Sequence, residues 1–352
     1  MSELYSWGSG SNGQLALNNQ LDISIPTLVR DLSDDNIQLI TDIVGGGSHT
    51  LFLLSNGQIY SCGLNDCGQL GYKGSGITNL KPLLIEFFDQ NQIKIQSVCA
   101  GWNSTIALDT NGQLWSFGSN SHSQLAQRNS NSIKKKIVLK KKSTTNTTTS
   151  TTKESSESLP SLVLPNCYYT PQLVVALKGI GIVAVASGMR HSIALDNCGR
   201  VYVWGCNKFG QLYLDKDTVI IQNEPTKLDL PDKVIQIACG SKHSCLILQT
   251  ECGQYNLLAA GSNKYGQLAN DDTFICKFTI PVNDIYSGSS ISKLNLQCGW
   301  SNTCLLIDKN LFICGRSEYG QLGNGNTQNV SVFKLVLSDV DQYSIGSEHV
   351  LD

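Results

Sequence analysis

The sequence predicts an all-β protein, a β-propeller of four-stranded blades, and three observations point to this fold class. A glycine followed five residues later by Gly-Gln-Leu (Ser-Gln-Leu in one copy) returns six times along the 352 residues. A Gly-x-x-His-like motif precedes five of these copies at a nearly fixed distance. Two apolar segments joined by a turn lie between the motifs. A repeat of this size is one supersecondary unit, which buries its apolar face by stacking on copies of itself.

The first motif sets the period. Its leading glycines stand at 8, 63, 118, 205, 261 and 315, so the steps are 55, 55, 87, 56 and 54 residues. We expect these glycines to let backbones approach closely near a central shaft. We expect the glutamines to bind loop backbone groups that would otherwise be buried without a partner, and the leucines to lie in the core. The motif is therefore interpreted as structural.

The second motif lies before the first at a similar distance in each repeat. Gly46, Gly101 and Gly188 each lie 17 residues before a leading glycine, and Gly240 and Gly299 lie 21 and 16 residues before theirs. The histidines at the end of the motif are His49, His191, His243 and His349, and Ser104 and Asn302 replace them in two copies. A metal site would not tolerate such replacement, so we expect structural histidines and no metal.

Strand signals fill the space around the two motifs. Asn56-Gly57 separates the apolar residues 51–54 from residues 58–60, which is a hairpin pattern. The glycine supplies the positive φ that such turns need. Residues 93–98, just before a Gly-x-x-His-like motif, alternate as a half-buried strand does. Each repeat therefore contains four short strands, which is typical of a propeller blade.

Composition gives an expected compartment and favours no class of partner. The chain is 41% apolar and has a formal net charge of −2. Its 13 cysteines include no Cys-x-x-Cys pair, and the start at Met1 opens directly onto a strand. The odd cysteine count and the missing leader lead us to expect a reducing compartment, the cytoplasm and also the nucleus. No apolar run approaches the roughly 20 residues needed to span a bilayer.

We interpret residues 1–352 as a single propeller domain with one insertion. The step of 87 residues exceeds the others by about 32, which we place at 128–160, with eight basic and two acidic residues. Six of these are lysines between Lys134 and Lys142, and a Ser/Thr-rich run follows. The composition predicts a disordered insertion in a loop that connects blades. Two roles stay open, a nuclear-import or anionic-surface signal and a solvated low-complexity expansion.

The two ends of the chain supply half a unit each. The chain begins at a strand with Trp7-Gly8 and stops just after the motif at 346–349, with five complete units between. If the first and last strands share one blade, the ring closes with six blade equivalents and no exposed sheet edge. The alternative is an incomplete chain whose further unit would follow Asp352.

Together the two motifs resemble the regulator of chromosome condensation repeat family. The resemblance covers the chain outside 128–160 and rests on six concordant copies. Within the family, the motifs at 45–49, 61–65 and 188–191 are most similar to the secretion-regulating guanine nucleotide exchange factor. The resemblance implies a propeller that usually has seven blades. It also implies that one face, which holds the Gly-x-x-His loops, acts on a small GTPase, as in the family's founder.

The founder places acidic side chains at the two variable positions of particular Gly-x-x-His loops. Here Glu348 is acidic, which makes it the candidate catalytic residue, whereas Arg190 and Lys242 have the opposite charge. Trp102 and Trp300 share one slot in two repeats, either to recognise a partner or to pack over a neighbouring blade; Trp and Arg often dominate interface energy. The candidate partner-binding residues are Ser48, Trp102, Asn103, Met189, Arg190, Ser241, Lys242, Trp300, Ser301 and Glu348.

These observations predict a protein-interaction module. One hypothesis is a regulator or guanine nucleotide exchange factor of a small GTPase in trafficking or secretion, acting through the Gly-x-x-His face. The alternative is a non-catalytic scaffold for other partners, or a chromatin or nuclear binder. The chain has no nucleophile elbow with a Ser/His/Asp set and no Gly-x-x-x-x-Gly-Lys phosphate loop, so we expect no intrinsic chemistry and no cofactor. We expect a monomer that binds a small GTPase or secretory component. Nucleic acid is not favoured, because the dense basic patch lacks interleaved aromatics.

Overall fold

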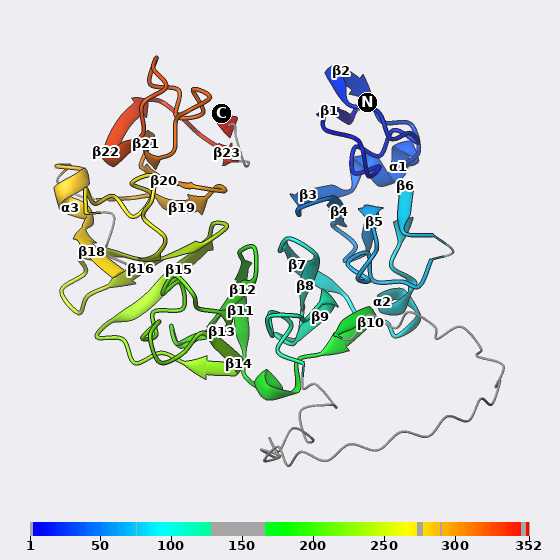
Figure 1. The fold of residues 1–352 in the computed structure, drawn as a ribbon, viewed down its shortest axis with the longest axis horizontal. Helices are drawn as coiled ribbons and strands as arrows, with labels where there is room; N and C mark the ends of the chain where they lie inside the picture. The colour runs from blue at the N-terminus through cyan, green and yellow to red at the C-terminus, as the bar shows by residue number, and fades with distance from the viewer. Residues whose placement is uncertain are drawn as a thin grey trace, which may run out of the picture.

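The computed structural model describes residues 3–74, 76–127, 166–272, 277–288, 291–345 and 350–351. Within these residues the strands form five four-stranded antiparallel sheets and two two-stranded sheets. The sheets stand around one axis in chain order, as the blades of a propeller (Figure 1), and the predicted fold class is confirmed. No helix of the described residues is long and apolar enough to cross a membrane.

Each complete blade consists of four consecutive strands. Blade 1 contains β3 (Ile40–Gly45), β4 (His49–Leu54), β5 (Ile59–Leu64) and β6 (Thr78–Leu84). Blade 2 contains β7 (Ile95–Ala100), β8 (Ser104–Asp109), β9 (Leu114–Ser119) and β10 (Cys167–Leu173). Blade 3 contains β11 (Ile182–Ser187), β12 (His191–Asp196), β13 (Val201–Cys206) and β14 (Ile221–Lys227). Blade 4 contains β15 (Lys233–Cys239), β16 (His243–Gln249), β17 (Tyr255–Gly261) and β18 (Lys277–Pro281). Blade 5 contains β19 (Leu294–Cys298), β20 (Asn302–Ile307), β21 (Asn310–Gly315) and β22 (Val330–Leu337).

The second strand of a blade is buried on both sides because it lies between neighbouring blades. β8, β12 and β20 are buried at all six of their positions. The clusters of buried apolar side chains join consecutive blades, and one of them unites Ile106 of β8, Ala194 of β12 and Trp204 of β13. Stacking of the blades therefore builds the core, as the repeat predicts.

The glycine motif has the structural roles predicted for it. Leu70, Leu125, Leu212 and Leu268 of this motif are fully buried. In each copy the glutamine Oε1 accepts a hydrogen bond, at 2.8–3.0 Å, from the backbone N–H two residues earlier. The side chain therefore satisfies a loop donor that would otherwise lack a partner.

Short helical turns occupy the connections that lead into the first strands of blades 1, 2, 3 and 5. They are α1 (Asp34–Gln38), α2 (Glu86–Gln90), the 3-10 turn η1 (Val175–Leu177) and α3 (Val282–Ile285). Each adds an apolar side chain to a core cluster, and Phe88, Leu177 and Val282 are almost completely buried. These turns therefore cover the core between one blade and the next.

The insertion separates two strands of one blade. The residues 128–160, for which disorder is predicted, lie outside the described residues. On either side of them β9 and β10 pair antiparallel as the third and fourth strands of blade 2. The prediction of a loop that connects two blades is therefore wrong. The spacing of the motifs shows that residues have been added, but it does not show which pair of strands they separate.

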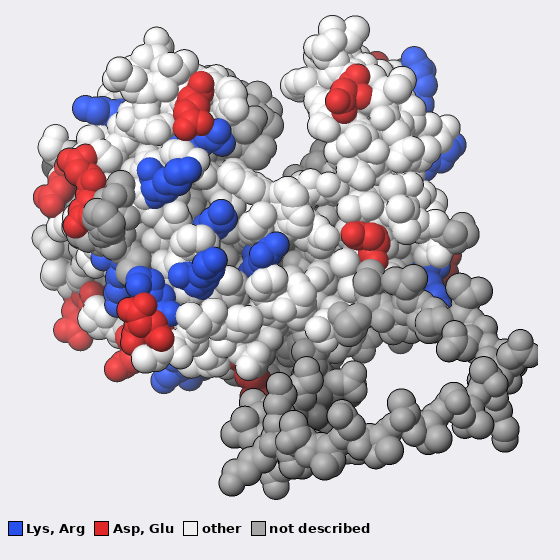
Figure 2. All heavy atoms as spheres, in the orientation of Figure 1, with Lys and Arg blue, Asp and Glu red and all other residues white. Residues whose placement is uncertain are grey.

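The chain ends form two separate two-stranded sheets. β1 (Tyr5–Gly8) pairs with β2 (Ile23–Leu28), and β23 (Ser344–Ile345) pairs with β24 (Val350–Leu351). By their motifs they are the outer and the inner halves of a blade, so six blade equivalents are present. Among the described residues the two sheets are not hydrogen-bonded to each other. Figures 1 and 2 show an open notch between them, so closure through a shared blade is not observed.

Candidate protein-binding face

The Gly-x-x-His loops of the described blades surround the mouth of a central cavity. Each loop joins the first strand of its blade to the second. The first strands and the first variable residue of each loop line the cavity, which has a volume of about 710 Å³. We call the side of the propeller that these loops form the loop face.

The first variable residues form a hydrogen-bonded rim around the cavity mouth. The backbone N–H of Gly47 donates to the carbonyl of Trp102 at 3.1 Å, and that of Trp102 donates to Met189 at 3.2 Å. The N–H of Met189 donates to Ser241 at 3.1 Å, and that of Ser241 donates to Trp300 at 3.0 Å. Every one of these bonds crosses from one blade to the next, so the rim fixes the loops relative to one another.

The two tryptophans of this rim touch each other at the cavity mouth. The rings of Trp102 in blade 2 and Trp300 in blade 5 lie edge to face, with centroids 5.1 Å apart and an interplanar angle of 64°. Trp102 also packs against Gly47 of the neighbouring blade, yet 38% of its surface stays exposed. The interpretation that the indole packs over a neighbouring blade therefore describes part of its surroundings. Recognition of a partner stays a prediction, for which exposed indole surface is available.

The second variable residues are anchored through their backbones. Their carbonyl oxygens accept hydrogen bonds of 2.7–3.0 Å from the N–H that follows the leading glycine of the same blade. These residues are Ser48, Asn103, Arg190, Lys242 and Ser301. Arg190 and Lys242 have exposed side chains, and Ser48 and Asn103 are half-buried. The anchored backbone leaves the charged side chains facing solvent.

Two of the predicted contact residues are buried in this structure, and one lies outside it. Ser241 and Ser301 are 7% and 6% exposed, and Ser241 Oγ donates to the carbonyl of Trp300 at 2.6 Å. Ser241 therefore helps to hold the rim, and neither serine is exposed for contact with a partner in the free protein. Glu348, the candidate catalytic residue, lies outside the described residues, as does His349.

The histidines in the loops of blades 1, 3 and 4 each contact a hydroxyl group of the next blade. His243 Nε2 lies 3.1 Å from Thr303 Oγ1, which donates to the carbonyl of Gln267 at 2.7 Å. Because the hydroxyl proton is used in that second bond, Nε2 is the donor in the first. His49 makes the same relay through Thr105 to Gln69, and His191 reaches Ser244 at 2.8 Å.

Burial keeps these histidines neutral. It lowers the pKa of His49 and His243 to about 4 and that of His191 to about 3. The loop glycine makes room for the ring, since a Cβ on Gly240 would lie 2.1 Å from Cε1 of His243. The geometry agrees with the structural role predicted for these residues.

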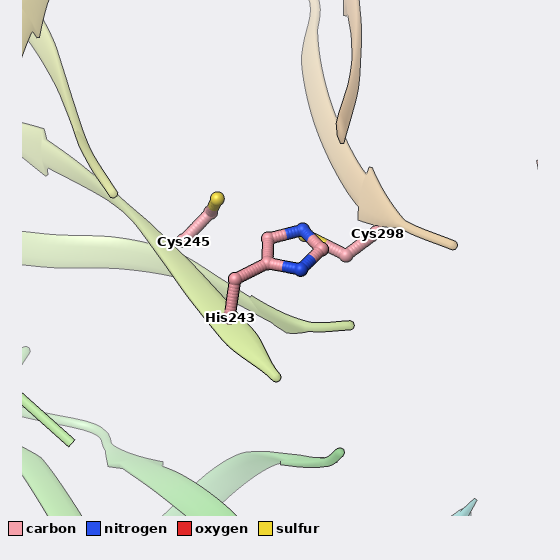
Figure 3. Close-up of side chains that lie close together, drawn as sticks. All are labelled: His243, Cys245 and Cys298. Carbon is pink, nitrogen blue, oxygen red and sulfur yellow. The ribbon is translucent and has the colours of Figure 1, made fainter. Parts of the chain in front are cut away.

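His243, Cys245 and Cys298 form a cluster of soft donor atoms (Figure 3). One donor atom from each lies within 4.8 Å of the others, and nitrogen with two sulfurs is a donor set that zinc accepts. However, Thr303 Oγ1 lies 3.7 and 4.0 Å from the two sulfurs and already accepts the hydrogen bond that His243 Nε2 donates. Burial raises the pKa of Cys298 well above its usual value, which disfavours the thiolate that a metal needs.

The equivalent place between blades 1 and 2 explains the cluster without a metal. His49 and Thr105 make the same contact there, with Leu51 and Ala100 where the two cysteines stand between blades 4 and 5. The position of the histidine thus follows from the repeat. We assign the three side chains to packing between blades.

The sequence interpretation missed a second set of loops beside the Gly-x-x-His loops. The two residues before each Gly-Gln-Leu vary between copies, and in the last three blades they are Lys208-Phe209, Lys264-Tyr265 and Glu318-Tyr319. Lys242 of the loop face lies over the Phe209 ring at 5.3 Å from its centroid. The sequence did contain a signal for these loops. The two residues before Gly-Gln-Leu differ from copy to copy, as the two variable residues of the Gly-x-x-His loops do.

The fold and the loop face define this protein as a β-propeller of the RCC1-like domain family. The model of that family, described as the RCC1-like domain, matches residues 3–351. The chain therefore belongs to this family, and the resemblance predicted from the motifs is confirmed.

Three relatives show the range of proteins that contain such a propeller. The chain is 34% identical to an RCC1 domain-containing protein of Dictyostelium discoideum, over 99% of this chain and 86% of the relative. It is 29% identical to the secretion-regulating guanine nucleotide exchange factor of Bos taurus, over 91% of this chain and 61% of the relative. It is 29% identical to the ultraviolet-B receptor UVR8 of Arabidopsis thaliana, over 98% and 69%. The chain thus spans less than two thirds of the bovine protein.

Solved structures support the fold. Yeast RCC1 (Prp20), solved in complex with Kap60, superposes with a TM-score of 0.72 at 20% identity, over 99% of this chain and 75% of that one. Human WBSCR16 superposes with a TM-score of 0.63 at 19% identity, over 99% and 98%. At these identities the likeness concerns the fold alone.

Proposed function

We propose that this protein is a recognition module that docks a partner protein on its loop face. The observation behind the proposal is the rim, in which backbone bonds between blades hold the exposed Trp102 at the cavity mouth. The exposed Arg190 and Lys242 follow rim residues directly, and each is anchored by a backbone bond within its own blade. Indole and guanidinium groups on a preorganised backbone are suited to interface anchors, because little side-chain or loop entropy is lost on binding.

A small GTPase or a secretory component is the class of partner that we propose for this face. A propeller relative of 29% identity is named a secretion-regulating guanine nucleotide exchange factor, and a yeast structure of the same fold is described for binding to Gsp1p and histones. The test is capture of purified small GTPases on the immobilised chain, with and without bound nucleotide. Preferential capture of a nucleotide-free GTPase supports the proposal, and a panel with no capture in either state rejects this partner class.

Exchange activity is the finer hypothesis, and a non-catalytic scaffold is its alternative. Exchange requires the face to stabilise a nucleotide-free GTPase, whereas a scaffold binds without changing the nucleotide state. The described variable positions include the cations Arg190 and Lys242 and no carboxylate, which favours the scaffold. Release of fluorescent GDP from any captured GTPase decides between the two, since a scaffold leaves the release rate unchanged.

We also propose that the protein acts in the cytoplasm and enters the nucleus, where chromatin is the alternative partner. The lysines between Lys134 and Lys142 supply the composition of an import signal. Imaging of the tagged full chain, beside a variant with these lysines changed to glutamine, tests both the distribution between cytoplasm and nucleus and the role of the lysines in import. Loss of the nuclear fraction in the variant supports import by this segment, and an equal distribution of the two forms rejects it.

A further inference from the structure

Cations and aromatic rings alternate across the loop face of blades 3 to 5. Lys208 Nζ and Lys242 Nζ lie 6.0 and 5.3 Å from the ring centroid of Phe209. Lys264 Nζ lies 4.8 Å from the Tyr265 centroid, and the Arg316 guanidinium lies 5.3 Å from the same ring. We call Lys208, Lys242, Lys264 and Arg316, with the rings beneath them, the cation ladder.

The ladder crosses the grooves between blades. Lys242 belongs to the Gly-x-x-His loop of blade 4, but its ring partner Phe209 belongs to blade 3. Arg316 of blade 5 likewise covers Tyr265 of blade 4. The series continues toward blade 2, where Arg190 Nη1 donates to His122 Nε2 at 3.4 Å. The repeat therefore places a cation contact at each boundary between consecutive blades from blade 2 to blade 5, and we call this series the arc.

The charge of this arc is one-sided. The Gly-x-x-His motifs of blades 3 to 5 and the segments 205–212, 261–268 and 315–322 include five cations and one carboxylate, Glu318. The acidic residues Asp215, Asp217, Asp271 and Asp272 follow these segments, further along the same loops. Glu318 Oε2 lies 2.6 Å from Arg316 Nη2, so the carboxylate offsets the charge of this guanidinium and leaves the lysines unpaired with it. Figure 2 shows Lys and Arg predominating over the middle of blades 3 to 5, with Asp and Glu mainly toward the outer edge of the molecule. The corresponding motif segments of blades 1 and 2, which are 46–49, 63–70, 101–104 and 118–125, contain Asp66 and no Lys or Arg.

We infer that the cation ladder is the docking site for an acidic segment of a partner protein. An ammonium held over a ring keeps its position while its outward N–H groups stay free to meet a carboxylate. Several cations along one arc fit the side chains of an extended Asp/Glu-rich segment, and charge complementarity selects such a partner and speeds its association. This inference rests on the proposed function and adds the chemistry of the partner.

The same observations favour a protein over a nucleic acid. Single-stranded nucleic acid binds to basic grooves by stacking its bases on aromatic faces. Here Phe209 and Tyr265 each have two cations near the ring, which would compete with a base for stacking. The formal charge of the whole chain is −2, so it offers no broad attraction to a phosphate backbone.

Fluorescence anisotropy of the full chain with three labelled probes tests the inference. The probes are a peptide of alternating Glu and Ser, its Gln/Ser counterpart and a single-stranded oligothymidylate of equal charge. The ladder variant combines Lys208→Gln, Lys242→Gln and Lys264→Gln. The matched control combines Lys94→Gln, Lys178→Gln and Lys233→Gln, three exposed lysines. Lys94 and Lys178 precede β7 and β11, and Lys233 is the first residue of β15, so all three lie at the ends of these strands away from the Gly-x-x-His loops.

We expect the acidic peptide to bind the wild type and the control equally at low salt, and the ladder variant about tenfold more weakly. The Gln/Ser peptide should not bind, and raising the salt concentration from about 50 to about 200 mM should weaken binding of the acidic peptide. Equal binding by the two triple variants, no binding of the acidic peptide, or tighter binding of oligothymidylate overturns the inference. If the inference about the cation ladder fails in this way, capture of a GTPase that depends on Trp102 would still support the proposed docking face. The two proposals can therefore fail separately.

Discussion

At the scale of the residue, we predict that the side chains of Trp102 and Trp300 matter more for recognition of a partner than for folding. Their edge-to-face contact adds about 1 kcal/mol beyond the area that it buries. We predict that Trp102→Ala or Trp300→Ala lowers the melting temperature by only about 2 °C in a chain of this size. The same changes should weaken partner capture at least tenfold, because indole anchors supply a large share of interface energy.

Trp204 is the matched control for that prediction. It is fully buried, and its Nε1 donates to the carbonyl of Gln124 in the preceding blade at 2.8 Å. Trp204→Ala should cost about 3–5 kcal/mol and lower the melting temperature far more than the rim variants. Thermal unfolding followed by circular dichroism measures all three. A loss of many degrees in both rim variants would identify their indoles as packing elements.

The relay histidines make stability depend on pH. Burial lowers their pKa to about 3 or 4 in the folded state, while in the unfolded chain it is about 6.5. The unfolded state therefore binds more protons between about pH 4 and 6.5, and the free energy of unfolding rises with pH in that window. The contribution is complete above about pH 6.5 and disappears as the pH falls toward 4.

We predict that His243→Asn flattens this pH dependence. Asparagine occupies the equivalent position at Asn302, so the loop accepts it. Wild type should lose about 2 kcal/mol per relay histidine between pH 7 and pH 5, and the variant should lose that amount less. Urea unfolding at the two pH values measures the difference. The same change in both proteins would mean that His243 is not desolvated in the folded state.

At the scale of the strand, the leading glycine of the third strand is the residue that the blade most strictly requires. Gly63 in β5 has a φ of +108°, and a Cβ there would lie 2.4 Å from the carbonyl oxygen of Ser48. That carbonyl accepts the N–H of Leu64 at 2.8 Å. The absence of a side chain therefore lets the Gly-x-x-His loop close onto the third strand.

We predict that Gly63→Ala destabilises the protein by about 2–4 kcal/mol, because both the φ angle and the carbonyl contact oppose a side chain. Gly45 of the same blade is the control, since nothing lies within 4 Å of an added Cβ there. Gly45→Ala should change the free energy of unfolding by less than about 1 kcal/mol. Chemical denaturation of the two variants measures the contrast, and equal effects would remove the explanation given for this glycine.

Elements with local signals could be predicted from the sequence, and elements shaped by neighbours could not. The turn at Asn56-Gly57 joins β4 to β5 with a φ of +83° at Gly57, as the hairpin pattern indicates. The turns α1, α2 and α3 were not predicted, because each is at most five residues long and shows no helical period. Phe88 in α2 is held by the cluster that it fills, and no property of the local sequence indicates that cluster.

At the scale of the whole molecule, the ring decides which residues meet. The sequence placed Trp102 and Trp300 in one slot of two repeats, but their contact depends on how many blades separate them around the axis. The same holds for Lys242 and Phe209, which belong to different blades. The period of the repeat shows which positions are equivalent in different blades. To predict which side chains touch across the axis or between blades, the angle between consecutive blades must also be known.

The last prediction concerns how stability is distributed around the ring. Blades interact with their nearest neighbours, so inner blades gain two interfaces, whereas β1–β2 packs on blade 1 and β23 lies against blade 5. β12 in blade 3 is buried at every position, while Tyr5 and Trp7 of β1 are 46% and 50% exposed. Hydrogen exchange should therefore be slowest in the second strands of blades 2 to 4. It should be faster in β1 and β2 by the equivalent of about 2 kcal/mol or more. Mass spectrometry of peptides from the exchanged protein measures this gradient, and uniform protection from β1 to β20 would show that the ring opens as one cooperative unit.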